Sequence, residues 1–487
     1  MIVARGPAER SRQLKEGDII VKVAQGDGDF VDLEHLDLDA IYNLITGPKG
    51  TVVRLLVRPL ENPSITKTVS LTRDLDLLHP PLYGLKAESR FGAMVFLPKS
   101  EQSTRGKRGS TIWVPLGPAE EIDKKAKTLI QSLKADGLGA KRLLKEFHEL
   151  IFAPVEKRLP EGTKTLIFSP DAELNFLPFA ALVDREGKFT CEKYEVLNVS
   201  TGRDLLFGPE GKGEISANLV LFADPAFGGK SSSPVKEPAS FDISPSSREA
   251  MRDLSFAPLQ GSKTEAEQVK RIASKFGLKS KLATGTLATE EALSKVRSPK
   301  ILHLATHGFF ISEEEVEEKP NRLAFFRKES RSRASNPMHR SGLALAGAKP
   351  TLELWAEDKP VPPANDGILT AEEAAMLDLS GTWLTVLSAC DTGSGVARAG
   401  EGVLGLRRAF AMAGTQNLLL TLWPVSDSFT KDFMVSFYEE ALKTSDAPRA
   451  MAKVQKDWLV KLREERSVGQ AVKLAGPFVL TFRGGLN

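Results

Sequence analysis

Short apolar runs alternate with amphipathic stretches across the last two thirds of the chain, and this alternation constrains the fold most. The apolar runs are residues 165–169, 219–223, 300–306, 384–389 and 417–423. Helical patterns accompany them at 264–275, 289–296, 402–413 and 428–442. Short, uninterrupted apolar runs of this kind are typical of strands buried on both faces of a parallel sheet. The pattern therefore predicts an α/β fold in which helices cover a mainly parallel sheet.

The first 75 residues follow another pattern. Segments 18–23 and 51–58 are rich in β-branched residues and are bounded by turn residues, which is typical of strands. A short helical stretch at 38–44 lies between them. We therefore expect a small α+β module at residues 1–75.

Residues 76–114 contain a Pro-rich segment followed by a polar stretch without hydrophobic period, so we expect a linker there. The main domain is then expected at 115–487. Two segments interrupt its pattern. Residues 228–250 are rich in Ser and Pro, and residues 313–340 run from an acidic block into a basic one, so both are expected to be solvated insertion loops.

The charge balance excludes some partners. The chain of 487 residues has 66 basic and 63 acidic side chains and a net charge of +3, which gives no strong field for a nucleic acid or an anionic membrane. Two cysteines, Cys191 and Cys390, cannot form a disulfide framework. No apolar run is long enough to span a membrane, and the first residues lack the pattern of a signal peptide. These features favour the cytoplasm.

Two residues with catalytic potential follow two of the predicted strands. His307 and Gly308 come directly after 300–306, and Cys390 comes directly after 384–389. In an open α/β sheet, ligands bind beyond the carboxyl ends of the strands, where rigid strands hold converging loops. We therefore expect the imidazole and the thiol at one edge of the sheet.

A thiol and an imidazole can together hydrolyse an acyl bond. The imidazole takes the thiol proton, the thiolate attacks a carbonyl, and backbone N–H groups stabilise the oxyanion. Gly308 permits a close approach, so its N–H and that of Cys390 are the expected oxyanion donors. Taken singly, a cysteine at a strand end is more often a buried apolar residue, and His-Gly is often a turn. We expect Cys191 to be structural in this sense.

His303 and His307 have the spacing of a His-x-x-x-His pair, but zinc needs further ligands, and a second cluster of Cys or His is missing from the sequence. We therefore expect no metal and no other cofactor.

The chain resembles the CHAT family, the caspase-like peptidases related to separases and gingipains. The resemblance covers about residues 115–487 and rests on motifs in the family's order. These are Leu304-Ala-Thr-His-Gly-Phe309, Ser341-Gly-Leu-Ala-Leu-Ala-Gly347, Gly367-Ile-Leu-Thr-Ala-Glu-Glu373, Leu387-Ser-Ala-Cys-Asp-Thr-Gly393, Gly400-Glu-Gly-Val-Leu-Gly-Leu-Arg-Arg-Ala-Phe410 and Leu422-Trp-Pro-Val-Ser-Asp427. It implies a caspase-like three-layer sandwich, with His307 as general base and Cys390 as nucleophile of a peptidase.

The resemblance to separase-like relatives also implies a pocket for an Arg or Lys side chain, with Asp427 as its acidic residue. Asp427 precedes the helix expected at 428–442, so a helix cap is an equal alternative. Asp391 either adds negative charge to the pocket or hydrogen-bonds a turn. A pocket for Asp would instead need an arginine, for which Arg398 and Arg407 are the alternatives.

The N-terminal module resembles the PDZ domain of tail-specific proteases through Gly6-Pro-Ala-Glu-Arg10, Leu14-Lys-Glu-Gly-Asp-Ile-Ile20 and Ile45-Thr-Gly-Pro-Lys-Gly-Thr51. PDZ domains bind peptides by adding a strand to a sheet edge and holding the terminal carboxylate on loop amides. Only five residues precede Gly6, where the family's first strand and carboxylate-binding loop are expected.

These observations predict a cysteine endopeptidase that cleaves protein or peptide substrates after a basic residue, with an activating protein partner as a further expectation. The alternative is a regulatory scaffold in which both modules bind peptides and the CHAT fold does not cut. Retention of both His307 and Cys390 favours the peptidase.

Overall fold

The chain forms two compact units, residues 1–88 and 89–487, in a computed structural model. The structure describes residues 11, 13–14, 18–33, 44–45, 51–59, 65–72, 90–97, 111–135, 139–206, 216–228, 254–310, 338, 341–357, 359, 366–388 and 401–484. All but the last residue of the expected helix at 38–44, and nearly all of the two expected insertion loops, lie outside these residues.

The N-terminal unit contains a four-stranded antiparallel sheet in the order β2-β1-β3-β4. Its strands are β1 Ile19–Gln25, β2 Val31–Asp32, β3 Val52–Arg58 and β4 Lys67–Thr72. Alternate residues of β3 are buried, so that Val53, Leu55 and Val57 form one side of a small apolar core. Both strands predicted in this unit are confirmed.

The second unit begins with a β-hairpin of β5 Arg90–Phe96 and β6 Thr111–Pro118. These strands include residues that the sequence pattern placed in a linker. The register shifts at Gly92, where an added Cβ atom would lie 2.8 Å from Cε2 of Trp113. Gly92 interrupts the hydrophobic alternation because the Trp113 ring occupies the space of a side chain, and this interruption hides the strand in the sequence.

An eight-stranded sheet in the order β10-β9-β11-β15-β16-β17-β8-β7 forms the centre of this unit. Its strands are β7 Thr165–Phe168, β8 Glu195–Asn198, β9 Ser216–Pro225, β10 Lys279–Gly285, β11 Pro299–Ala305, β15 Leu384–Leu387, β16 Asn417–Thr421 and β17 Phe478–Phe482. The five strands from β10 to β16 are parallel. β17 is antiparallel to β16, and β8 and β7 run parallel to β17. The sheet therefore consists of two parallel blocks that run in opposite directions.

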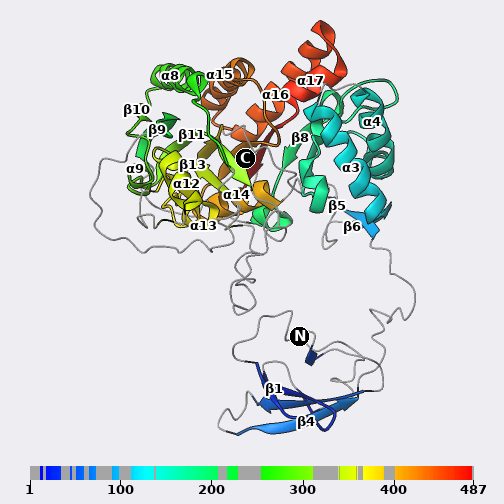
Figure 1. The fold of residues 1–487 in the computed structure, drawn as a ribbon. Helices are drawn as coiled ribbons and strands as arrows, with labels where there is room; N and C mark the ends of the chain where they lie inside the picture. The colour runs from blue at the N-terminus through cyan, green and yellow to red at the C-terminus, as the bar shows by residue number, and fades with distance from the viewer. Residues whose placement is uncertain are drawn as a thin grey trace. The chain divides into compact units, whose positions relative to one another are not determined.

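Helices cover both faces of this sheet (Figure 1). One face carries α8 Gln260–Lys275, α15 Asp427–Thr444 and α16 Ala447–Glu465. The other carries α12 Ala348–Ala356, α13 Ala371–Ala374 and α14 Glu401–Met412. The three layers confirm the predicted sandwich and its mainly parallel sheet.

The remaining short elements flank these layers. Beside β7 and β8 lie α3 Ala119–Lys134, α4 Ala140–Phe147, the π-helix η1 His148–Phe152, α5 Ala153–Glu156, the 3₁₀ helices η2 Ala172–Phe176 and η3 Phe179–Ala181, α6 Thr190–Lys193 and α17 Val468–Ala475. The 3₁₀ helix η4 Gly202–Leu206 follows β8, and α9 Glu290–Ser294 precedes β11. A small antiparallel sheet joins β12 Gly308–Phe310, β13 Ser341–Ala344 and β14 Ile368–Thr370.

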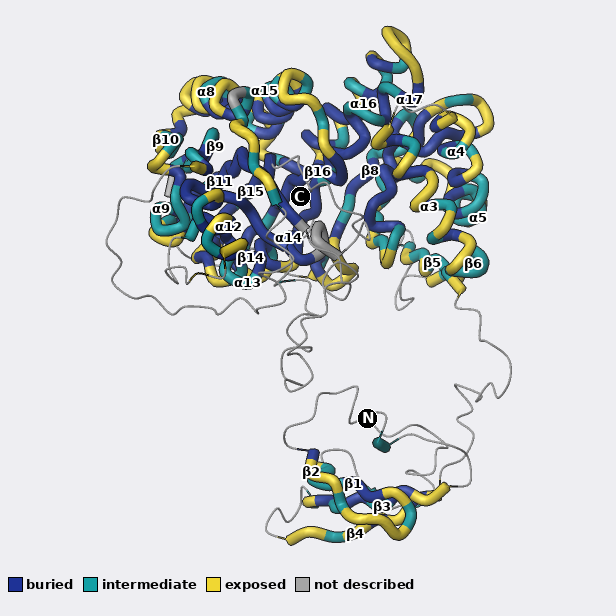
Figure 2. The backbone as a smooth tube through the Cα atoms, viewed as in Figure 1, coloured by how far each residue is buried: buried dark blue, intermediate teal, exposed yellow. Residues whose placement is uncertain are grey.

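One large apolar core extends between the sheet and its helices. The central strands β11, β15 and β16 are buried along their length, as Figure 2 shows. A second, smaller cluster lies around Phe227, Phe309 and Trp355. It packs against the end of β9 and the small sheet, at the edge where the central strands end.

Candidate active site at the carboxyl edge of the sheet

β11, β15 and β16 are parallel neighbours, so their carboxyl ends meet at one edge of the sheet. Leu304 of β11 pairs with Leu387 of β15, and the N–H of Ser388 donates to the carbonyl of Leu304 at 2.9 Å. His307 follows β11 at this edge. Cys390 and Asp391 lie outside the described residues, as does Arg398.

His307 is buried, with 4% of its surface exposed. Its Nε2 lies 2.7 Å from the carbonyl oxygen of Ala257. A carbonyl oxygen can only accept, so Nε2 carries a proton, and in the neutral ring Nδ1 is then the basic nitrogen. The segment that precedes α8 therefore selects the tautomer of this histidine.

Two aromatic rings hold the His307 ring in place. The centroid of Phe227 lies 5.2 Å away, and that of Phe256 lies 5.7 Å away in a stacked arrangement. Phe256 is close in sequence to Ala257, so one short segment supplies both a ring contact and the hydrogen-bond acceptor. Stacked rings restrict the orientation of the imidazole, as the Ala257 carbonyl does.

The backbone beyond His307 joins the small sheet. The carbonyl of His307 accepts a hydrogen bond from the N–H of Ala344 at 2.9 Å, and the Thr306 hydroxyl donates to the carbonyl of Ala344. Gly308 starts β12 and pairs with Leu343. The turn after β11 is therefore anchored on both sides of the histidine.

A chain of buried polar side chains lies beneath this edge. The Ser388 hydroxyl donates to Oε2 of Glu265 at 3.1 Å, and Oε1 of Glu265 lies 3.3 Å from Nε2 of His303. Nδ1 of His303 is 2.9 Å from the hydroxyl of Tyr438. The four residues come from the position after β15, from α8, from β11 and from α15. Burial and the negative charge of Glu265 raise the pKa of Tyr438 well above its ordinary value.

This polar chain accounts for His303, which the sequence paired with His307 at metal-ligand spacing. His303 is fully buried and its ring nitrogens face Glu265 and Tyr438. Among the described residues, no three His, Cys, Asp or Glu side chains are placed to hold a metal ion.

Asp427 is the first residue of α15 and is exposed. Ser426 occupies the N-cap position, but its side chain makes no capping hydrogen bond. Cγ of Asp427 would lie 2.7 Å from a Cβ atom added at Gly261, so the carboxylate packs against the first turn of α8. It therefore lies near the positive ends of two helix dipoles, close to the edge where β9 and β16 end.

Two further residues of the sequence analysis lie away from this edge. Arg407 is 3% exposed and donates from Nη1 to Oδ1 of Asn175 at 3.1 Å. Cys191 is buried in α6, and burial raises the pKa of its thiol to about 12. Cys191 therefore stays protonated at neutral pH, as expected of a structural cysteine.

Several of these partners were missed in the sequence. Glu265 carries no local signature other than its place on the buried side of α8, and any residue could supply the carbonyl of Ala257. Ser388 offered the only local signal, because it is a polar residue two positions before Cys390.

No helix within the described ranges has the length and apolar character to cross a bilayer.

A family model of the CHAT domain matches residues 141–468. Tetratricopeptide repeat protein 28 from Mus musculus is 26% identical over 331 residues, which are 65% of this chain and 12% of that protein. The protein of the same name from Homo sapiens is 26% identical over 336 residues, again 65% of this chain and 12% of that protein. The chain thus spans about an eighth of these curated relatives.

A tail-specific protease from Haemophilus influenzae is 30% identical over 150 residues, which are 28% of this chain and 19% of that protein. Among solved structures, the PDZ domain of a carboxy-terminal protease from Vibrio cholerae is 44% identical and covers 15% of this chain and 76% of its own, with a TM-score of 0.15. The Arg-specific cysteine proteinase gingipain R is 9% identical over 75% of each chain, with a TM-score of 0.35.

The CHAT match covers more than half of the chain and includes His307 and the strands that end at this edge. The chain therefore belongs to the CHAT domain family, and it combines an α/β domain built on a mainly parallel sheet with an N-terminal module that resembles the PDZ domain of tail-specific proteases.

Proposed function

We propose that the chain is a cysteine endopeptidase in which His307 is the general base and Cys390 the nucleophile. The observation that carries the proposal is the hydrogen bond from Nε2 of His307 to the carbonyl of Ala257 at the edge shared by β11 and β15. This bond leaves Nδ1 as the nitrogen that can take a thiol proton.

The register of the two strands supports the pairing of these residues. Leu304 and Leu387 pair and are 83 residues apart, and His307 and Cys390 are also 83 residues apart. Neighbouring strands lie about 4.8 Å apart. Continuing the same register would therefore bring the imidazole and the thiol within reach of each other.

The chemistry follows from these groups. Nδ1 of His307 takes the proton of Cys390, the thiolate adds to the scissile carbonyl, and the oxyanion accepts hydrogen bonds from the N–H groups of Gly308 and Cys390. His307 then protonates the leaving amine as the C–N bond breaks, which leaves a thioester on Cys390. Water, deprotonated by His307, hydrolyses the thioester and releases the acid. No metal ion or organic cofactor takes part in this sequence.

Asp427 and Asp391 are the proposed acidic residues of a pocket for Arg or Lys. Asp427 is exposed at the carboxyl edge of the central strands, where His307 also lies, and this position supports the role. Its contact with Gly261 holds the carboxylate close to two helix N-termini, which lowers its availability to a substrate cation. The N-terminal module is proposed to capture peptide substrates, as PDZ domains do. A cytoplasmic location fits the free thiol that the mechanism needs.

The test compares the full chain with its Cys390→Ala and Cys191→Ala variants on peptides that carry Arg, Lys, Asp or Leu at the cleaved position. We expect cleavage by the wild type and by Cys191→Ala, and none by Cys390→Ala. Equal activity in all three proteins would reject the mechanism. Alkylation by iodoacetamide gives a second readout, because the thiol of Cys191 is protonated and buried, so that labelling near neutral pH should depend on Cys390.

The pocket is tested by Asp427→Asn and by Gly261→Ala. A methyl group at Gly261 displaces the Asp427 carboxylate without changing its charge. If Asp427 receives the basic side chain, both variants lose activity on Arg and Lys peptides and retain the residual activity on Leu peptides. Unchanged selectivity in both would assign Asp427 to the stabilisation of α15 alone.

The rival function is a scaffold that binds peptides without cutting them. Tetratricopeptide repeat protein 28, which matches 65% of the chain, is named for its repeats and not for a peptidase activity. Three results together would establish this rival. The wild type would bind peptides, and it would leave the Arg, Lys, Asp and Leu peptides uncut even in the presence of cell extract. Its Cys390 would be alkylated no faster than its Cys191.

A further inference from the structure

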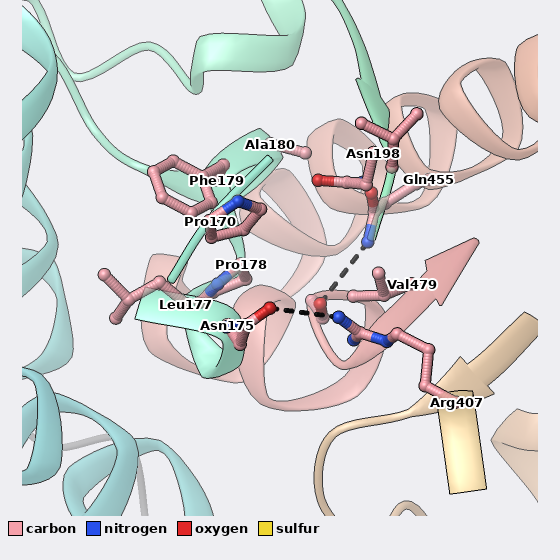
Figure 3. Close-up of a pocket in the computed structure, with 12 residues that line it drawn as sticks. Pro170, Asn175, Leu177, Pro178, Phe179, Ala180, Asn198, Arg407, Gln455 and Val479 are labelled. Atoms are coloured by element: carbon pink, nitrogen blue, oxygen red, sulfur yellow. Dashed lines mark hydrogen bonds between the residues drawn. The ribbon is translucent and has the colours of Figure 1, made fainter. Parts of the chain in front are cut away.

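The eight-stranded sheet opens between β17 and β8. These strands share a single paired position, Thr481 with Asn198, whereas β17 pairs with β16 along its full length. A small cavity lies at this opening, between Val479 of β17, Asn198 of β8 and Arg407 of α14 (Figure 3). The cavity is small: the volume open to the centre of a water-sized sphere is about 10 Å³.

Arg407 is the charged residue at this cavity. Its Nη1 donates to Asn175, and its Nε and Nη2 have no hydrogen-bond partner in the part of the chain that the structure describes. The side chain is 3% exposed, so water does not surround these two nitrogens. Unpaired buried donors of a charged group cost several kcal/mol, and native proteins usually satisfy them.

The two unpaired nitrogens lie on one edge of the guanidinium. Nε and Nη2 present parallel N–H groups, which is the arrangement that binds an anion in a bidentate manner. Figure 3 shows this guanidinium beside the amide of Asn175, and Asn198 and Gln455 also line the cavity. The Asn175 amide donates to the carbonyl of Ala172, and the Gln455 amide donates to the carbonyls of Ala475 and Phe478, so these amide groups are already occupied.

The charge of Arg407 has no counter-ion among its described neighbours. Burial is the cause that lowers the pKa of its guanidinium to about 10, and no carboxylate opposes that shift. The group is still positive near neutral pH. By contrast, the partly exposed Arg463 pairs with both carboxylate oxygens of Glu192, which raises its pKa. Arg407 therefore lacks the kind of anionic partner that Arg463 has.

We propose that the Arg407 cavity binds a small monovalent inorganic anion of the size of chloride. Its volume is close to the minimum that holds one water molecule, which excludes phosphate, sulfate and any organic acid. The anion accepts hydrogen bonds from Nε and Nη2 and neutralises the guanidinium. This proposal does not depend on the peptidase proposal, because the cavity lies away from His307.

The first test measures thermal unfolding of the full chain in sodium gluconate that is replaced stepwise by sodium chloride or bromide at constant ionic strength. A ligand that binds only the folded state raises the melting temperature in proportion to the logarithm of its concentration above the dissociation constant. We expect this rise for the wild type and not for Arg407→Met, which keeps the apolar stem and removes the charge.

The matched control is Arg408→Met, which changes an exposed arginine on the same helix. It should keep the full response to chloride. The same response in Arg407→Met and wild type would overturn the proposal, as would a wild type whose melting temperature is independent of the anion.

The second test does not need a folded variant. Crystals of the wild type grown in gluconate and soaked in bromide are expected to show an anomalous peak within hydrogen-bond distance of Nε and Nη2 of Arg407. A peak for water alone at this position, with no anomalous signal at high bromide concentration, would show that the cavity holds a solvent molecule and would overturn the proposal.

Discussion

Two histidines four residues apart, His303 and His307, differ in what holds them. His303 is fully buried, and its ring nitrogens face two side chains, Glu265 and Tyr438, that come from the helices on one face of the sheet. His307 lies past the strand end, and its Nε2 is held by the backbone carbonyl of Ala257.

The comparison separates a structural histidine from one suited to catalysis. Removing a partner of His303 leaves a buried polar group unsatisfied in the core, so its contacts act on stability. The contact of His307 selects a tautomer at the edge where substrates bind in α/β sheets, so it acts on reactivity. Substitutions among the partners of His303 should therefore change the free energy of unfolding, and substitution of His307 should change the rate of peptide cleavage.

The largest effect is expected for His307→Ala. Loss of the proposed general base should lower kcat/KM on the cleaved peptide by about 10²- to 10⁴-fold, and loss of a buried ring that contacts Phe227 and Phe256 should also lower the melting temperature. Peptide kinetics and thermal unfolding of the same preparation measure both. If the variant retains the kcat/KM of the wild type, His307 has no catalytic role.

Glu265→Ala should act on stability. The substitution leaves the Ser388 hydroxyl without its buried acceptor and removes the carboxylate that faces Nε2 of His303, and an unsatisfied buried group of this kind costs about 1–3 kcal/mol of unfolding free energy. Denaturant unfolding followed by fluorescence measures the loss.

Glu267→Ala is the control for this variant, because Glu267 lies on the same helix and is only partly buried. We expect a change within about 0.5 kcal/mol there. Equal losses in the two variants would mean that helix α8, rather than the polar chain around His303, accounts for the effect.

Tyr438→Phe should have the smallest effect near neutral pH, about 1 kcal/mol for one lost hydrogen bond. Its pH dependence sharpens the comparison. The pKa of Tyr438 is raised in the folded protein, so the unfolded chain releases this proton first, above its ordinary value of about 10. The wild type therefore loses stability as the pH rises through that value, and the variant should lose less. If the free energy of unfolding falls equally with pH in both proteins above that value, Tyr438 is not the group responsible.

The strands and helices of the second unit were largely predictable. The apolar runs at 165–169, 300–306 and 384–389 became β7, β11 and β15. β11 and β15 are central strands buried on both faces, which favours an apolar residue at nearly every position, whereas β7 is an edge strand that is only partly buried. Their directions were not predictable. β7 runs opposite to β11, and the hydrophobic pattern of a strand reads the same in either direction.

The candidate site was predictable only in part. His307 and Cys390 could be named because catalytic groups follow strand ends and because the motifs around them resemble a family. The partners of His307 could not. Ala257 is 50 residues away and contributes only a carbonyl oxygen, which every residue has, so no side-chain pattern marks it. The same holds for Glu265, whose partner Ser388 is 123 residues away.

The sequence by itself determined which segments become strands, which residues can do acid–base chemistry and which family the motifs resemble. These properties are local, since they depend on side-chain type and on periods of a few residues. Only the tertiary structure decided that His303 is committed to a buried polar chain, that Nδ1 of His307 is the basic nitrogen, and that Arg407 faces a cavity between two strands. Each of these depends on groups that are distant in the chain and meet only when the sheet and its helices pack.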